Sequence, residues 1–72
     1  MEIKTGKYRH FKGNEYLVLD VAYHSETLAP MVVYKALYGD GKTWVRPAEM
    51  WNETVHRDDY HGPRFQYIGD DQ

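Results

Sequence analysis

Trp44 and Arg46 are the pair of residues best suited to binding chemistry in this sequence. They stand two positions apart in a segment, residues 43–46, that is typical of a strand, so both side chains point to one face. An indole offers a stacking platform, and a guanidinium beside it can hold a carboxylate or a phosphate. The alternative is structural: Trp44 packs on Tyr34 or Tyr38, and Arg46 forms an ion pair within the protein.

A second polar group follows the longest apolar segment of the chain. His24 and Glu26 share a face if the strand continues through them, so His24 could act as a general base with Glu26 as its partner acid. Ser25 points to the opposite face and is not placed as a nucleophile for His24. The structural alternative is a loop anchor, in which the hydroxyls of Ser25 and Thr27 cap a turn and Glu26 pairs with a nearby cation.

Nitrogen ligands for a metal come from four histidines, His10, His24, His56 and His61, and the chain has no cysteine. No two of them stand four apart on a helix, and His56 and His61 are five apart in a polar stretch, which fits no standard zinc pattern. We therefore predict no metal site and no cofactor, and interpret the imidazoles as solvated or hydrogen-bonded groups. A histidine–carboxylate site for a transition metal is the weaker alternative.

Residues 7–12 interleave cations with rings, as Lys7, Tyr8, Arg9, His10, Phe11 and Lys12. Small β-barrels bind single-stranded nucleic acids with surfaces of this kind. The formal net charge of -2 and the isoelectric point near 6.0 lack the basic footprint expected of such proteins. Nucleic-acid binding is therefore the second hypothesis, behind the recognition of a protein, a peptide or a small anionic ligand.

The size and composition of the chain predict one small domain with rings to spare. Its 72 residues contain seven tyrosines, two tryptophans and two phenylalanines, which is 15% aromatic. A core this small does not hide all of these rings, so we expect several of them at a binding surface.

The absence of certain segments bears on location. The chain has no cysteine and no N-terminal apolar run, which favours a cytoplasmic protein. No apolar stretch approaches the roughly 18 residues that span a bilayer, so we expect no membrane partner.

Alternating apolar residues and glycine-marked turns predict an all-β domain spanning residues 1–72, with its core over about residues 6–68. The expected elements are strands over 7–11, 15–24, 31–38 and 43–46, a three-residue helical turn over 47–51, a polar loop over 52–63, and a closing strand over 64–68. Both faces of the segment 15–24 are partly apolar, which predicts a kink near Asp20. This order predicts a five-stranded SH3-like barrel with one short helical turn before the last strand.

Several longer sequence words carry a resemblance to a known family. They are GKYRHFKG at residues 6–13, VAYHSET at 21–27, VYKALYGD at 33–40, WVRPAEMW at 44–51 and PRF at 63–65. In these words the chain resembles a family of short bacterial proteins catalogued as a domain of unknown function, although Trp51 stands where that family usually carries phenylalanine. The resemblance implies an SH3-like barrel and a cytoplasmic bacterial protein, and it implies no activity.

The leading hypothesis is a small bacterial binding module that recognises a peptide, protein or small anionic ligand. The candidate ligand-binding residues are Arg9, His10, His24, Glu26, Tyr34, Tyr38, Trp44, Arg46 and Trp51. We expect a concave aromatic patch, with Trp44 or Trp51 partly exposed near Arg46 or Arg9. No residue is assigned a catalytic role, and a small enzyme using His24 and Glu26 is the third hypothesis.

Overall fold

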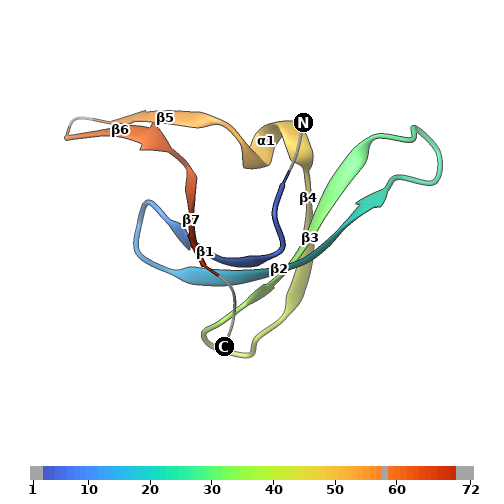
Figure 1. Ribbon diagram of the computed structural model, residues 1–72, viewed down its shortest axis with the longest axis horizontal. Coiled ribbons are helices and arrows are strands. Elements are labelled where there is room, and N and C mark those ends of the chain that lie inside the picture. Colours follow the sequence, from blue (N-terminus) through green and yellow to red (C-terminus); the bar gives the residue numbers. More distant parts are fainter. Residues whose placement is uncertain (1–2, 58, 70–72) are drawn as a thin grey trace.

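A computed structural model describes residues 3–57 and 59–69 of the chain (Figure 1). The main sheet contains β1 (Gly6–His10), β2 (Glu15–Tyr23), β3 (Pro30–Ala36), β4 (Thr43–Pro47) and β7 (Phe65–Gly69). Between β4 and β7 lie α1 (Ala48–Trp51), β5 (Thr54–Arg57) and β6 (Tyr60–Pro63). The expected strands and the helical turn are all present, with ends shifted by one or two residues.

The strand order of the main sheet is β4-β3-β2-β1-β7, and every neighbouring pair is antiparallel. The all-β, five-stranded, SH3-like arrangement with a short helix before the last strand is thereby confirmed. The expected closure is corrected, because β4 and β7 lie at opposite ends of the sheet and the sheet is not closed into a barrel. Trp51 occupies the interior between these ends, where its ring contacts Tyr8 and Phe65.

The long strand β2 contains the kink that its two-faced pattern predicts. Its register against β3 shifts between Val18 and Asp20, so Leu19 is the extra residue of a β-bulge. Val18 before the bulge is buried and Val21 after it is half-buried, although the two positions differ in parity. The bulge therefore lets both halves of β2 present apolar side chains to one interior.

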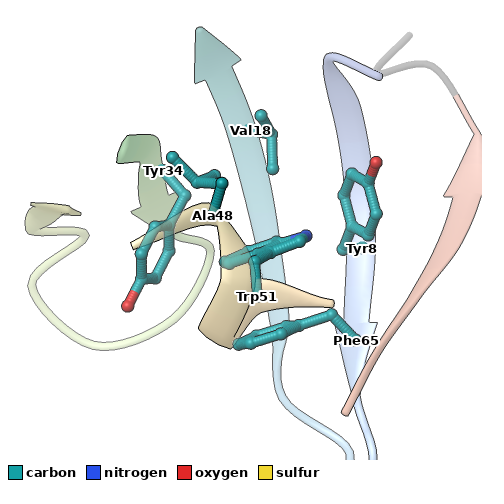
Figure 2. Packing of buried hydrophobic residues seen from close by; sticks show 7 residues of the cluster. Tyr8, Val18, Tyr34, Ala48, Trp51 and Phe65 are labelled. Atoms are coloured by element: carbon teal, nitrogen blue, oxygen red, sulfur yellow. The ribbon is translucent and has the colours of Figure 1, made fainter. Parts of the chain in front are cut away.

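The helix α1 is a single α-helical turn and not the tighter three-residue turn expected. The N–H of Asn52 donates to the carbonyl of Ala48, four residues earlier, at 3.3 Å. α1 packs against β3 and β4 and places Trp51 in the core beside Tyr34 and Phe65 (Figure 2). In the described ranges 3–57 and 59–69, no helix has the length and hydropathy needed to cross a bilayer.

The segment 52–63, expected to be a loop, instead contains the β5–β6 hairpin. One face of the hairpin is anchored, because Val55 is buried and the Tyr60 ring stacks on Phe11 with centroids 5.5 Å apart. The guanidinium of Arg57 lies over the same Phe11 ring at 5.5 Å. The hairpin was missed because only one of its residues, Val55, is a buried aliphatic, so its strands lack the apolar alternation on which strand prediction depends.

Candidate functional site

The register between β3 and β4 fixes which way Trp44 and Arg46 point. Trp44 lies opposite Tyr34, and Arg46 lies opposite Val32. Tyr34 and Val32 are both core residues, so Trp44 and Arg46 project from the interior side of the sheet. β4 is an end strand of this sheet, and Trp44 is 51% exposed. The expected shared face for these two residues is present in the structure.

Three tyrosines continue this side of the sheet. The Tyr16 ring meets Tyr34 and Tyr38 edge to face at 5.4 and 5.6 Å, and the hydroxyls of Tyr16 and Tyr38 are 2.8 Å apart. Burial, followed by the hydrogen bond and the charge of Tyr38, raises the pKa of Tyr16 to about 12. Tyr38 itself is 48% exposed, so the cluster begins in the core and ends at the surface.

Arg46 lies at the other end of this side, over an aromatic ring. Its guanidinium carbon is 5.7 Å from the centroid of Phe65. Its Nε is buried with no hydrogen-bond partner. The ion pairs among the described residues are Arg9–Glu15 and Arg64–Glu53, so within those residues Arg46 has no carboxylate partner.

His10 shares the environment of Arg46. The imidazole packs edge to face on Phe65 at 5.0 Å, and its Nδ1 accepts a hydrogen bond from the Lys12 N–H at 3.1 Å. Burial lowers the pKa of His10, and the charges of Arg64, Lys12 and Arg46 lower it further. Burial and the neighbouring cations therefore favour the neutral form of the imidazole beside Arg46.

We call this set the aromatic face. It comprises His10, Tyr16, Tyr34, Tyr38, Trp44, Arg46 and Phe65. A hollow of about 210 Å³ opens at one end of it, lined by Ala36, Trp44 and residues 38–42. Figure 2 shows the interior end, where the Tyr34 ring lies beside Trp51, with centroids 4.8 Å apart, and the Tyr34 hydroxyl points away from the indole. A second hollow of about 210 Å³, between Pro30 and Ala48, has no aromatic ring and no cation in its lining and is less suited to an anionic ligand.

Trp51, proposed from sequence as a ligand-binding residue, lies in the core. Its side chain is 2% exposed and stacks on Phe65, so it supports the aromatic face from behind. Tyr16 and Phe65 were missed by the sequence prediction. The alternation of β2 carried a signal for Tyr16, because it stands two residues before the buried Val18 and so faces the same side.

Arg9 lies on the opposite side of the sheet. It is exposed and pairs with Glu15 at 3.0 Å, whereas its neighbours Tyr8 and His10 point toward the core side. The cations and rings of this strand are therefore divided between two faces. Lys12 nevertheless stays with a ring, because its Nζ lies over Phe11 at 5.8 Å. Nucleic-acid binding stays a prediction, with fewer rings on the basic face than the sequence suggested.

His24 and Glu26 lie far from the aromatic face, in the β2–β3 connection. The connection joins the Pro30 end of β3, whereas Tyr38 follows the other end of that strand (Figure 1). The Nδ1 of His24 accepts the N–H groups of Glu26 and Thr27 at 3.1 and 3.3 Å. This is the loop-anchor alternative, with the imidazole in place of a hydroxyl as the principal capping group.

The histidines remain dispersed in the fold, with one exception. Among residues 3–57 and 59–69, no group of three or more His, Asp or Glu side chains gathers in a metal-binding arrangement. His56 and His61, however, are cross-strand partners in β5 and β6, which the sequence prediction could not place because it treated the segment as a loop.

The fold and the aromatic face define a small all-β domain of SH3-like strand order, with an open sheet and a ring-lined surface. The chain belongs to the family described as a protein of unknown function (DUF1653), which it matches over residues 6–67. It is similar to a crystal structure of a protein of this family from Bordetella bronchiseptica, with a TM-score of 0.89 and 38% sequence identity. That similarity covers 99% of this chain and 94% of the other. The comparison with curated proteins gives no match.

Proposed function

We propose that this protein is a binding module whose aromatic face recognises an anionic ligand that also carries a planar or apolar group. The carboxylate or phosphate of the ligand binds Arg46, and its apolar part lies on Trp44 and Tyr38. The observation that supports this most directly is the guanidinium of Arg46, which lies over Phe65 and, among the residues that the structure describes, has no carboxylate partner and no hydrogen-bond partner for its buried Nε.

A cation beside exposed rings suits such a ligand for electrostatic reasons. A guanidinium presents a fork of N–H donors that matches two oxygens of a carboxylate or phosphate. It lies partly out of water, so its attraction for an anion is stronger than at an open surface.

The hollow gives the ligand an orientation. Asp40 and Lys42, which carry opposite charges, both line the hollow. In the sequence they lie on one side of Trp44, and Arg46 lies on the other. The charges of Asp40 and Lys42 offset each other at that end, so Arg46 is the stronger anchor for the charged group of the ligand, and the apolar group faces Tyr38. A peptide with an aromatic residue next to a carboxylate, and a small aryl acid, both meet these requirements.

Phenyl phosphate is a simple probe of this arrangement, because it joins one ring to one anion. In a ¹H–¹⁵N NMR titration we expect saturable shifts at Tyr38, Trp44 and Arg46. Arg46→Gln should abolish them, whereas Arg9→Gln, which removes an exposed cation on the opposite side, should leave them unchanged. Shifts that persist in Arg46→Gln, or that disappear equally in Arg9→Gln, contradict the proposal.

A further inference from the structure

We propose that His56 and His61 form a binding site for a divalent metal ion that prefers tetragonal coordination, and that Cu²⁺ is the ion that binds most tightly. The two residues are cross-strand partners on the β5–β6 hairpin. Their Nδ1 atoms are 3.0 Å apart, and their rings meet edge to face with centroids at 5.1 Å. The site is separate from the aromatic face and does not depend on the function proposed for it.

The spacing of the two nitrogens fits a metal bound by both. Imidazole nitrogens bind a metal at about 2.0–2.1 Å, so nitrogens 3.0 Å apart subtend an angle of about 90° at the ion. That is the angle between neighbouring ligands in square-planar or tetragonal coordination, which Cu²⁺ and Ni²⁺ prefer with nitrogen and oxygen donors. It is narrower than the tetrahedral angle of a structural zinc site. Among first-row divalent ions, the Irving–Williams order then favours Cu²⁺.

The hairpin holds the pair while leaving it open to solvent. Val55, Arg57 and Tyr60 turn to the other face, where Val55 is buried and the two longer side chains lie over Phe11. Alternation along the strands places His56 and His61 on the outer face, and both are exposed. The contact with Phe11 fixes the anchored face, so the two imidazoles approach an ion without rearrangement of the strands.

The state without metal is compatible with this role. One Nδ1 carries a proton and donates a hydrogen bond to the other Nδ1, 3.0 Å away. For both Nδ1 atoms to coordinate, that one imidazole moves its proton to Nε2, and the pair stays neutral. Solvent exposure of both side chains allows this change of tautomer without loss of a buried hydrogen bond. Water molecules complete the coordination of the ion.

Titration with CuCl₂ alone, followed by ¹H–¹⁵N NMR of the full chain, tests the proposal. Paramagnetic broadening should begin at the amides around residues 56 and 61 at substoichiometric Cu²⁺ and leave the β2–β3 connection sharp. Broadening centred on Met1, His24 or His10 overturns the proposal. This titration uses the unmodified protein and needs no variant.

Matched variants give a second measurement by calorimetry. His56→Asn or His61→Asn should each lower the Cu²⁺ association constant at least as much as the roughly 10–100-fold that loss of an outer-shell partner costs. His24→Asn removes a single exposed imidazole from another hairpin and should leave the constant unchanged. Equal affinity in His56→Asn, His61→Asn and the unmodified chain contradicts the inference.

Discussion

The indole of Trp51 lies flat against the ring of Phe65, with centroids 3.7 Å apart and planes inclined by 2°. These residues flank the β5–β6 hairpin, Trp51 at the end of α1 and Phe65 at the start of β7. Between this stack and the hairpin strands, the Arg64 N–H donates to the Glu53 carbonyl at 2.9 Å, and the side chains of Arg64 and Glu53 form an ion pair at 3.1 Å. The stack and these bonds together close the base of the hairpin and join it to the main sheet.

Replacement of Trp51 by alanine should remove most of the stability of the domain. Its ring is 2% exposed and contacts Tyr8, Tyr34 and Phe65, so the cavity costs about 3–5 kcal/mol in the free energy of unfolding. Urea denaturation followed by circular dichroism measures this. Trp44→Ala, which removes a half-exposed indole, should change the free energy by about 0.5 kcal/mol or less. Equal losses in the two variants would place the core elsewhere.

Tyr38→Phe should lower the pKa of Tyr16. Burial is the largest cause of its rise to about 12, and the hydrogen bond and charge of Tyr38 are the next two. Without the Tyr38 hydroxyl, the pKa should fall but stay above the ordinary value of 10.0, because burial remains. Ultraviolet absorption during an alkaline titration records tyrosinate formation. An unchanged titration in Tyr38→Phe would show that the hydroxyl contact does not form in solution.

The same shift of Tyr16 predicts how stability changes in alkali. A pKa raised in the folded state means that the unfolded chain loses its proton first. The contribution of Tyr16 is therefore complete below pH 10.0 and is lost as the pH rises toward 12. Between these two pH values, the melting temperature should fall less steeply with rising pH in Tyr16→Phe than in the unmodified protein. A steeper fall in the variant contradicts the assignment.

His10 should make the fold less stable in mild acid. Burial and the cations Arg64, Lys12 and Arg46 lower its pKa below the ordinary 6.5, so the unfolded chain takes up the proton more readily. The contribution of His10 is complete above pH 6.5 and is lost as the pH falls through its folded value. Urea midpoints measured across this range should decline less in His10→Gln. An equal decline in His10→Gln and the unmodified chain would contradict the assignment.

Leu28→Gly should stabilise the protein, although it removes a large apolar side chain. Leu28 has a φ of 65° and is 71% exposed, so it carries left-handed strain without the benefit of burial. Relief of that strain is worth about 1 kcal/mol. Ser25→Gly in the same connection, where φ is not positive, should destabilise instead. The two melting temperatures should therefore shift in opposite directions.

Much of the fold follows from local patterns. The glycines at positions 13, 39 and 41 all adopt positive φ, and each lies in a turn that the sequence predicted. The kink of β2 was also predictable from the sequence. Apolar side chains on both faces of one strand can reach a single core only if a bulge shifts the alternation partway along the strand. The expected barrel closure did not follow from these patterns, because closure depends on whether Trp51 or a further strand pairing fills the space between β4 and β7.

The candidate site was predictable where neighbouring positions on one strand define it. Trp44 and Arg46 share a face because they stand two apart on β4, and this needs no knowledge of the tertiary structure. The contacts of Arg46 with Phe65 and of Tyr16 with Tyr38 join residues that are distant in the chain, and sequence alternation does not specify such pairs. The His56–His61 pair was hidden for the same reason, since its spacing becomes meaningful only when the segment is a hairpin.

The bulge at Leu19 has a consequence for how the chain can be shortened. Val18 pairs with Tyr34 and Asp20 with Val33, so every position of β2 beyond Leu19 keeps its partner if that one residue is deleted. The deletion would leave the ladder continuous and the inward or outward direction of each downstream side chain intact. The deletion would remove the local bend of β2, the strand that brings Val18 into the same core cluster as Trp51.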